Sequence, residues 1–239
     1  MNTHTANEDT RPVTFFCAFA LKRAVQDVIL PAYLQAGGAP VEAVFEPTFR
    51  LLTRIESGAR PDVMAGISGS LADLVASNIL ANPRPVARTG VGVAVAPDAR
   101  IPDINTVETF IAAVASARSV AYSRSGPSGI YFAGLLEQLG IAERVKARAT
   151  VIDSGPTAVA LLDGRADLAI QQLSELILVP AATIVGPLPG AIQEYTDFST
   201  ALGSEASRPS GAAVLRDFLH GPEALAAYAA NGLEIFSKK

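Results

Sequence analysis

Short apolar runs alternate with helix-like segments through the first third of the chain. Three runs of strand length predict buried strands: residues 13–17, 41–45 and 62–66. Two segments between these runs place apolar side chains at helical spacing: residues 21–35 and 50–56. Pro31 predicts a kink in the first helix, and Gly58 predicts the end of the second. This β-α-β-α-β order is typical of a parallel sheet with helices on both faces.

A second run of alternating elements begins at residue 89. Residues 89–97 are rich in valine and alanine with interspersed glycines, and they predict a strand that crosses into a second lobe. Thr106 is the expected cap of a helix over residues 106–117. The remaining elements are predicted as strands at 119–122, 149–152 and 167–171 and helices at 130–139 and 156–163.

The last part of the chain is predicted to return to the first lobe. Residues 195–202 predict the returning strand. Two closing helices are expected over residues 212–219 and 223–231. We therefore expect an α/β protein of two lobes, each a mostly parallel sheet flanked by helices, with a ligand cleft between the lobes. Lobe 1 takes residues 13–88 and 196–239, and lobe 2 takes residues 89–195.

Composition narrows the classes of partner. Of the 239 residues, 49% are hydrophobic and 18% are charged, so there is ample material for a core. The formal net charge of −4 gives no basic face for nucleic acid. No apolar run in the sequence reaches the length of about 18 residues that a membrane span needs. We expect a small-molecule anion as the partner, with no nucleic acid and no membrane span.

Cysteine and histidine are too scarce for a metal centre or a disulfide. Cys17 is the only cysteine, and a buried core thiol is a better fit for it than a reactive one. His4 lies in a polar leader, and His220 is expected at a helix end, where the dipole favours it. We expect no metal and no cofactor.

The first twelve residues give an expectation for the cellular location of the protein. Residues 1–12 are polar and contain no apolar signal segment, which favours a cytoplasmic protein. A processed mature form of a periplasmic protein fits the same residues.

Residues 122–131 (YSRSGPSGIY) combine serine, glycine and arginine at a strand-to-helix turn. A helix start offers unpaired backbone N–H groups and the positive end of the helix dipole, which together bind anions. Arg124 adds a full positive charge to this turn, and the serines add donors. The turn predicts half of an anion pocket. An ordinary turn with serine as the helix cap fits the same residues.

Other predicted strand ends are polar as well. They are residues 18–20, 46–48, 153–156 and 171–172. In parallel sheets, ligands bind beyond the carboxyl ends of the strands, so these segments are expected to face the cleft.

The order of these motifs resembles the periplasmic molybdate-binding proteins, which have the type 2 periplasmic-binding fold. Residues 16–21 (FCAFAL) are similar to the family's AASL opening, and residues 51–62 (LLTRIESGARPD) to its L…QIE.GAPAD motif. Residues 126–131 (GPSGIY) resemble its VPAGIY motif, and residues 159–170 (VALLDGRADLAI) its V..GEAD.GI.Y motif. The resemblance covers about residues 13–235 and implies that fold.

Departures from the family pattern imply a different ligand. The family's ligand serine aligns with Ala20, its second hydroxyl site with Thr48 and Phe49, and its tyrosine with Gln172. Arg50 and Arg124 add charge where the family is neutral. A planar guanidinium binds a carboxylate in a fork, so a small carboxylic acid fits better than a metal oxyanion.

The predicted ligand-binding residues follow from this alignment and from the anion turn. They are Ala20, Thr48, Phe49, Arg50, Ser123, Arg124, Ser125, Ser128, Gly129, Ser154 and Gln172. Lys22 or Arg23 is a further candidate, while Arg50 could instead face solvent on its helix.

The resemblance leaves enzyme and receptor open. Aconitate isomerase also resembles this family, so the chain is predicted to be a cofactor-independent isomerase that moves a proton and a double bond in a polycarboxylate. The alternative is the solute receptor of an importer, with a permease partner. A cytoplasmic ligand-sensing domain is the last of the three interpretations. Such domains usually accompany a DNA-binding helix-turn-helix, and the sequence shows none.

An isomerase needs a base. Glu46 is the first candidate, since Phe45 and Pro47 are expected to desolvate it and raise its pKa. Asp153 and Glu175 are second choices, and Asp153 also fits a plain helix cap. Two tyrosines are possible acids, Tyr122 and Tyr131, although the family motif suggests a packing role for Tyr131.

Overall fold

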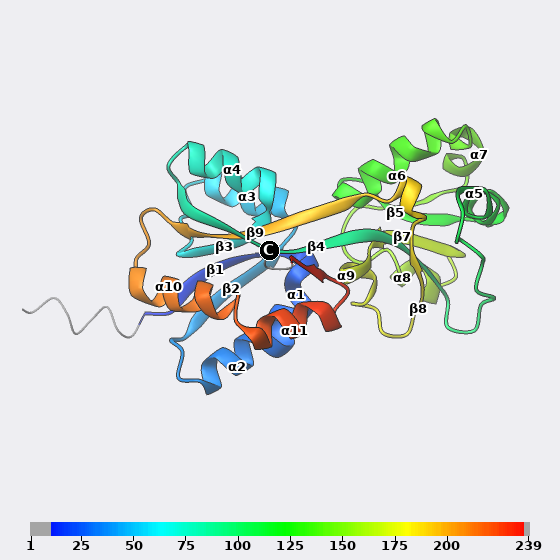
Figure 1. Cartoon of the computed structure of the whole chain (residues 1–239). Helices are drawn as coiled ribbons and strands as arrows, with labels where there is room; N and C mark the ends of the chain where they lie inside the picture. Colours follow the sequence, from blue (N-terminus) through cyan, green and yellow to red (C-terminus); the bar gives the residue numbers. More distant parts are fainter. Residues whose placement is uncertain (1–10, 237–239) are drawn as a thin grey trace, which may run out of the picture. The chain divides into compact units, whose positions relative to one another are not determined.

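The computed structural model describes residues 11–236 of the chain. His4 and most of the polar leader lie outside the described residues. The chain divides into two compact units (Figure 1). Unit 1 contains the residues up to Arg88 and those from Asp197 onward, and unit 2 contains Thr89–Thr196.

Unit 1 is built on a mixed sheet. Its strands are β1 (Val13–Ala18), β2 (Val41–Glu46), β3 (Val63–Ile67), the first part of β4 (Leu80–Val95), most of β9 (Tyr195–Gly203) and β10 (Glu234–Ile235). The strand order is β2-β1-β3-β9-β4, with β10 on β4. β1 runs parallel to β2 and β3, whereas β9 is antiparallel to β3. The prediction of a mostly parallel sheet is therefore wrong for the part of unit 1 that contains the returning strand, β9.

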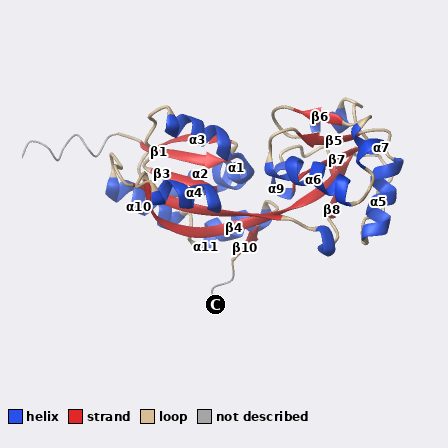
Figure 2. Cartoon of the chain, turned by 90° about the horizontal axis from the view of Figure 1, so that it is seen from above, coloured by secondary structure: helices blue, strands red, loops and turns tan. Residues whose placement is uncertain are grey.

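The helices of unit 1 come from both ends of the chain. They are α1 (Lys22–Ala24), α2 (Leu30–Gln35), α3 (Thr48–Glu56), α4 (Ser68–Ala76), α10 (Pro209–Phe218) and α11 (Pro222–Ala230). The sequence patterns did not predict α4. Figure 2 shows these helices beside the strands of the unit.

The single helix expected over residues 21–35 is broken into shorter turns. A 3₁₀ turn at Phe19–Leu21 leads into α1, and a π turn at Val25–Ile29 separates α1 from α2. Leu30 N–H donates to the Val25 carbonyl, five residues earlier. Pro31 follows directly and has no N–H, so a regular α-helical ladder cannot continue through it. The predicted kink is therefore a π turn.

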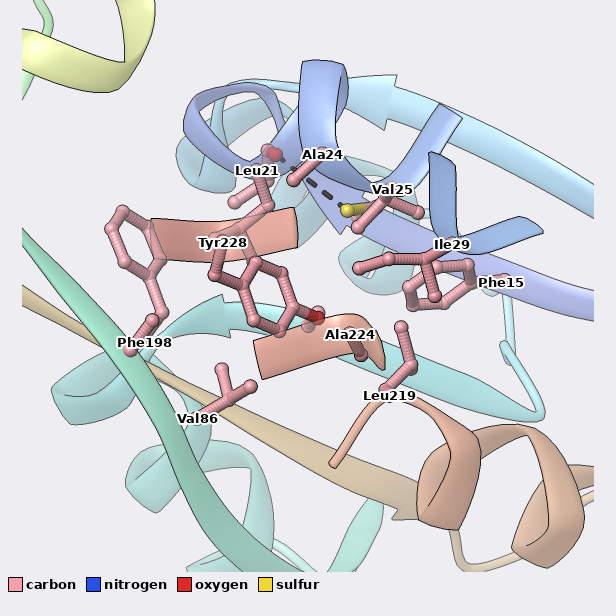
Figure 3. Packing of buried hydrophobic residues seen from close by; sticks show 14 of the residues in the cluster. Phe15, Leu21, Ala24, Val25, Ile29, Val86, Phe198, Leu219, Ala224 and Tyr228 are labelled. Carbon is pink, nitrogen blue, oxygen red and sulfur yellow. Dashed lines mark hydrogen bonds between the residues drawn. The ribbon is translucent and has the colours of Figure 1, made fainter. Parts of the chain in front are cut away.

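The core of unit 1 packs the first strand against the last helices. Figure 3 shows Phe15 of β1, Ile29 of the π turn and Tyr228 of α11 within this cluster. Cys17 is fully buried here, its Sγ lies 3.7 Å from the Ala18 carbonyl oxygen, and burial raises the pKa of its thiol far above the ordinary value. The prediction of a buried core thiol is confirmed.

A buried carboxylate joins three segments of unit 1. Asp62 accepts hydrogen bonds from Thr14 N–H (2.8 Å) and Thr14 Oγ1 (2.9 Å), and from Ser207 Oγ (3.0 Å). Burial raises the pKa of Asp62, but these hydrogen bonds outweigh it and hold the pKa below its usual value. Asp62 therefore stays ionised and ties β1 to the segment before α10.

Unit 2 also has a mixed sheet. Its strands are the second part of β4, β5 (Val120–Ser123), β6 (Thr150–Ile152), β7 (Leu168–Gln172) and β8 (Thr183–Pro187). β5 runs parallel to β6 and β7, whereas β4 is antiparallel to β7 and β8. β8 was not predicted.

The helices of unit 2 are mostly short. They are α5 (Val107–Ser116), α6 (Pro127–Gln138), α7 (Ala142–Lys146), α8 (Val159–Leu162) and α9 (Leu173–Leu176), with a 3₁₀ turn at Gly190–Ile192. Thr106 caps α5 in a reciprocal box with Thr109, which confirms the predicted cap. Across residues 11–236, no helix combines the length and apolar character of a membrane span.

Candidate functional site

The carboxyl ends of neighbouring parallel strands form one polar edge in each unit. In unit 1, Ala18 of β1 lies opposite Glu46 of β2, and β3 flanks β1 on the other side. We call the segments that end or follow these strands, residues 18–22, 46–50 and 67–70, the unit 1 edge. In unit 2, β5 lies between β6 and β7. Residues 123–129, 153–157 and 171–175 there form the unit 2 edge.

Glu46 is held by an arginine. Arg54, two turns into α3, donates from Nε to Oε2 (2.7 Å) and from its terminal nitrogen to Oε1 (2.6 Å). This fork lowers the pKa of Glu46 below its usual value and outweighs the effect of burial. The expected raised pKa is wrong, because Phe45 and Pro47 leave the side chain 25% exposed and Arg54 reaches it.

Two cations of the unit 1 edge lie over aromatic rings. Arg50 Cζ lies 5.8 Å from the centre of the Phe49 ring, and Lys22 Nζ lies 5.6 Å from that of Phe19. Arg50 and Phe49 are exposed. Stacking on an aromatic face leaves the edge of a guanidinium open to a carboxylate.

The small residues of the unit 1 edge are buried. Thr48 is 5% exposed, and its Oγ1 accepts a hydrogen bond from Ile67 N–H at 3.4 Å. Ala20 is also buried and brings no hydroxyl. Ser68, at the start of α4, shares a hydrogen bond of 2.8 Å with Ser199. Sequence reasoning missed Ser68, although the run Ser-Gly-Ser after an apolar strand is a helix-start signal.

The predicted anion turn forms a tight strand-to-helix connection. Ser123 Oγ accepts from Gly126 N–H at 3.0 Å, so this hydroxyl stabilises the turn itself. A side chain on Gly129 would place a Cβ 1.8 Å from the Ser123 carbonyl oxygen, so only glycine fits there. The helix begins at Pro127 rather than at residue 130. Ser128 is buried and Ser125 is exposed.

Arg124 has a partner that the sequence did not reveal. Its Nε donates to Asp153 Oδ1 at 2.5 Å, with side chains 64% and 75% exposed. Asp153 does not cap α8, whose N-cap residue is Ala158, so the cap alternative is wrong. Ser154 is exposed beside it. Exposed ion pairs contribute little to stability, so a ligand carboxylate can compete with Asp153 for this guanidinium.

The end of β7 is buried and uncharged. Gln172 is 2% exposed, and its Nε2 donates to Thr196 Oγ1 at 2.8 Å. Glu175 follows in α9, where burial raises the pKa of its carboxyl to about 7, against a smaller lowering by a hydrogen bond from the Gln171 side chain. The pKa of Glu175 is therefore raised, whereas that of Glu46 is lowered.

Tyr122, Tyr131 and His220 each contact residues of their own unit. Tyr122 meets Phe132 edge to face at 5.3 Å between ring centres. Tyr131 donates its hydroxyl to the Ile192 carbonyl oxygen at 2.8 Å, and burial raises its pKa. His220 follows α10 as predicted and shares a 2.8 Å hydrogen bond with Thr200. Burial first, and then Arg84 and Arg216, lower the pKa of His220 to about 4, so it carries no charge at the helix end at pH 7.

Among residues 11–236, no group of three or more histidine, cysteine, aspartate or glutamate side chains is placed to hold a metal ion. The polar side chains of the two edges carry hydroxyl, amide, carboxylate, guanidinium and ammonium groups.

Residues 13–234 match the family described as bacterial extracellular solute-binding protein. The chain belongs to this family. The resemblance expected from the sequence motifs is thereby confirmed. Aconitate isomerase from Pseudomonas sp. is 31% identical to this solute-binding protein over 214 residues, which cover 86% of this chain and 81% of the relative.

Solved structures show the same fold. The periplasmic molybdate-binding protein of Azotobacter vinelandii is 19% identical, with a TM-score of 0.76, and the match covers 94% of this chain and all of that one. The substrate-binding domain of a molybdenum transporter from Clostridium difficile is 13% identical, with a TM-score of 0.73 over 95% and 99% of the two chains. At these identities the likeness establishes the fold alone.

Proposed function

We propose that this solute-binding protein binds a small polycarboxylate and isomerises it, moving a proton and a double bond without a cofactor. The observation that carries the proposal is its 31% identity to aconitate isomerase over most of both chains. Capture of the ligand between two lobes, as expected from the sequence, is part of this proposal, and so is the cytoplasmic location.

Cations at the two edges support a carboxylate ligand. Arg50 is exposed beside Phe49, and Arg124 is exposed in a weak ion pair with Asp153. A guanidinium donates two parallel hydrogen bonds to a carboxylate, and the charge it brings also stabilises the enolate-like anion that forms when a proton leaves carbon. Either arginine would hold a carboxylate of a ligand bound at its own edge.

The second candidate is a transport receptor for a small anion. The observation that favours it is the fold likeness to the Azotobacter vinelandii molybdate-binding protein together with the family's description as extracellular solute-binding. A receptor would bind the same carboxylate, or a metal oxyanion, without changing it.

Binding and turnover separate these candidates. Melting curves of the purified chain are recorded with cis-aconitate, trans-aconitate, citrate, molybdate and tungstate, because a ligand that binds only the folded state raises the melting temperature. Proton NMR in D₂O then follows conversion of one aconitate isomer to the other and deuterium entry at carbon. We expect stabilisation by the polycarboxylates and interconversion of the isomers.

Other results would replace the proposal. Stabilisation by molybdate or tungstate alone would make the chain an oxyanion receptor. Stabilisation by polycarboxylates with neither conversion nor exchange would make it a carboxylate receptor.

The arginines are tested with a matched control. Arg124→Ala removes one side of an exposed ion pair at the unit 2 edge, and Arg165→Ala removes one side of the exposed pair with Asp163, just before β7. Both changes should alter the melting temperature of the free protein little. Only Arg124→Ala should weaken stabilisation by aconitate, and an equal ligand effect in both variants would exclude Arg124 from the site.

A further inference from the structure

A group of buried polar residues lies where β7 ends and α9 begins. Gln171 is 4% exposed, Gln172 is 2% exposed and Ser174 is 2% exposed. Buried polar groups cost free energy unless they are hydrogen-bonded, so each of them calls for a partner. Their partners within unit 2 decide which atoms remain for a ligand.

The side chain of Gln171 is oriented by Thr157. The Gln171 Oε1 atom accepts from Thr157 N–H at 2.7 Å and from Thr157 Oγ1 at 3.0 Å. A backbone N–H can only donate, so the oxygen of the Gln171 amide must face Thr157. The amide NH₂ therefore points away from Thr157, and the Gln171 side chain lowers the pKa of the Glu175 carboxyl.

The side chain that lowers the pKa of Glu175 is thus a neutral amide. The strands packed against α9 are β7 (LAIQQ) and β8 (TIVGP), and neither contains a titratable residue. Burial raises the pKa of Glu175 to about 7, and the Gln171 amide limits the rise because it stabilises the charged form. Glu175 as a whole residue is half-buried.

Ser174 supplies a second, independent observation. Its backbone N–H donates to Thr89 Oγ1 at 3.4 Å, but its hydroxyl is buried and has no hydrogen-bond partner among the described residues. A buried hydroxyl without a partner destabilises the fold, and a carboxylate or enolate oxygen that accepted from it would offset that cost. Ser174 therefore has an unused hydroxyl donor next to Glu175 in the sequence.

We propose that Glu175 is the residue that transfers the proton in this site, with Ser174 Oγ donating to the substrate and Gln171 positioning the Glu175 carboxyl. This inference rests on the proposed isomerase function and names the part of the chain that carries it out. It also names the substrate class: an unsaturated polycarboxylate with a CH₂ group between its double bond and a carboxylate.

The step balances without a co-reactant. The Glu175 carboxylate takes a proton from the CH₂ carbon, and the C–H electron pair forms a new double bond to the central carbon. The electron pair of the old double bond moves to its far carbon, which takes the proton back from the Glu175 carboxyl. Negative charge that builds up on the substrate carboxylates in between is stabilised by the hydroxyl and guanidinium donors.

Glu46 fits this role less well. Its carboxylate is committed to the fork from Arg54, and a base with a depressed pKa accepts a proton from carbon poorly. Assigning the base to Glu175 or to Glu46 therefore predicts opposite results when each glutamate is replaced and deuterium exchange is measured.

The experiment compares three isosteric variants of the full chain in D₂O. Glu175→Gln should lower deuterium exchange and isomer conversion by about 100-fold or more, the usual effect of losing a general base, while aconitate still raises the melting temperature. Glu46→Gln should keep exchange within a few-fold of wild type. Glu143→Gln on α7 is the control for an exposed glutamate of unit 2 and should behave as wild type.

Two further variants keep the proposal testable even if Glu175→Gln does not fold. Glu175→Asp keeps a carboxyl and should retain part of the activity with an altered pH profile. In wild type, the rate should rise with pH and level off above an apparent pKa of about 7, as the base ionises. Ser174→Ala should melt at the same temperature as wild type or higher in the absence of ligand, yet bind aconitate several-fold more weakly.

The outcomes distinguish the two levels of the proposal. If wild type binds and exchanges aconitate but Glu175→Gln does so equally well, Glu175 is not the base and the inference is overturned. If Glu46→Gln alone loses exchange, the base is at the end of β2. If wild type neither binds nor exchanges a polycarboxylate, the proposed function fails and the role of Glu175 falls with it.

Discussion

The two strand-end edges hold their polar groups in different ways. At the end of β2, charged side chains pair in solvent, as Glu46 does with Arg54, or lie over exposed rings, as Arg50 does. At the end of β7, Gln171 and Gln172 are buried, and their side chains hydrogen-bond to the uncharged groups of Thr157 and Thr196. The surroundings of a glutamate near a strand end thus decide its pKa. The guanidinium of Arg54 lowers the pKa of Glu46, whereas burial raises that of Glu175 to about 7.

Breaking the close backbone packing at the unit 2 edge should have the largest effect on the free energy of unfolding. Gly129→Ala would place a methyl group 1.8 Å from the Ser123 carbonyl oxygen, and neither backbone can yield without moving α6 or β5. We expect a loss of about 3 kcal/mol or more in the free energy of unfolding, measured by urea denaturation. Gly134→Ala, in the same helix with open space around it, should stabilise by about 0.5–1 kcal/mol. Equal effects in both variants would mean that α6 does not start against β5.

The pH dependence of stability should distinguish the two glutamates. The raised pKa of Glu175 means that the folded state keeps its proton between the ordinary value of 4.5 and about 7, where the unfolded chain loses it. Its stabilising contribution is therefore full below 4.5 and lost as the pH rises to 7, by at most about 3 kcal/mol. Urea unfolding at pH 5 and pH 8 should show this loss in wild type and not in Glu175→Gln. An identical pH dependence in both would contradict the raised pKa.

Gln171 affects both the stability of the unit 2 edge and the pKa of Glu175. Gln171→Met keeps the approximate volume but leaves Thr157 N–H, which is fully buried, without its acceptor. We expect a loss of about 1–3 kcal/mol in stability and a further rise in the pKa of Glu175, because its donor is gone. The acid limb of the pH–rate profile should move to higher pH. Gln138→Met, at the exposed end of α6, is the matched control and should change neither quantity.

The exposed pair at the unit 1 edge should matter least for stability. Glu46→Gln breaks the fork with Arg54, and exposed pairs of this kind contribute about 0.2–1 kcal/mol. Comparison with Arg54→Met and the double variant isolates the coupling between the two side chains. A coupling energy above about 2 kcal/mol would contradict this ranking, because the Glu46–Arg54 pair would then stabilise unit 1 as strongly as the buried groups stabilise unit 2.

Local patterns predicted much of the fold. The strand at 119–122 and the cap at Thr106 are determined by neighbours within a few residues, and both are found close to where they were expected. The first half of β4 was missed because Pro83 and Pro85 argue against a strand. Short helices such as α9 have too few residues to show a period.

The candidate site was less predictable, because its chemistry depends on contacts between distant residues. The Phe45 and Pro47 neighbours suggested a desolvated Glu46, but Arg54 on the next helix decides its pKa. Gln171 was noted as a polar strand end, yet its orientation depends on Thr157, which lies on a different segment. The unpartnered hydroxyl of Ser174 has no sequence signal, since a serine at a helix start is usually a cap.

The division of the chain affects how the protein is made. Unit 2 is one continuous stretch, Thr89–Thr196, inserted into unit 1, whose core packs Phe15 and Val25 against Tyr228 and Leu233. On a ribosome, β1 emerges long before α11 exists, whereas every strand and helix that fills the core of unit 2 arrives in one piece. We expect unit 2 to fold first during synthesis, while the apolar β1–β3 segment waits for the last helices. Chaperones that shield apolar nascent chains should therefore bind translation intermediates that end before residue 222.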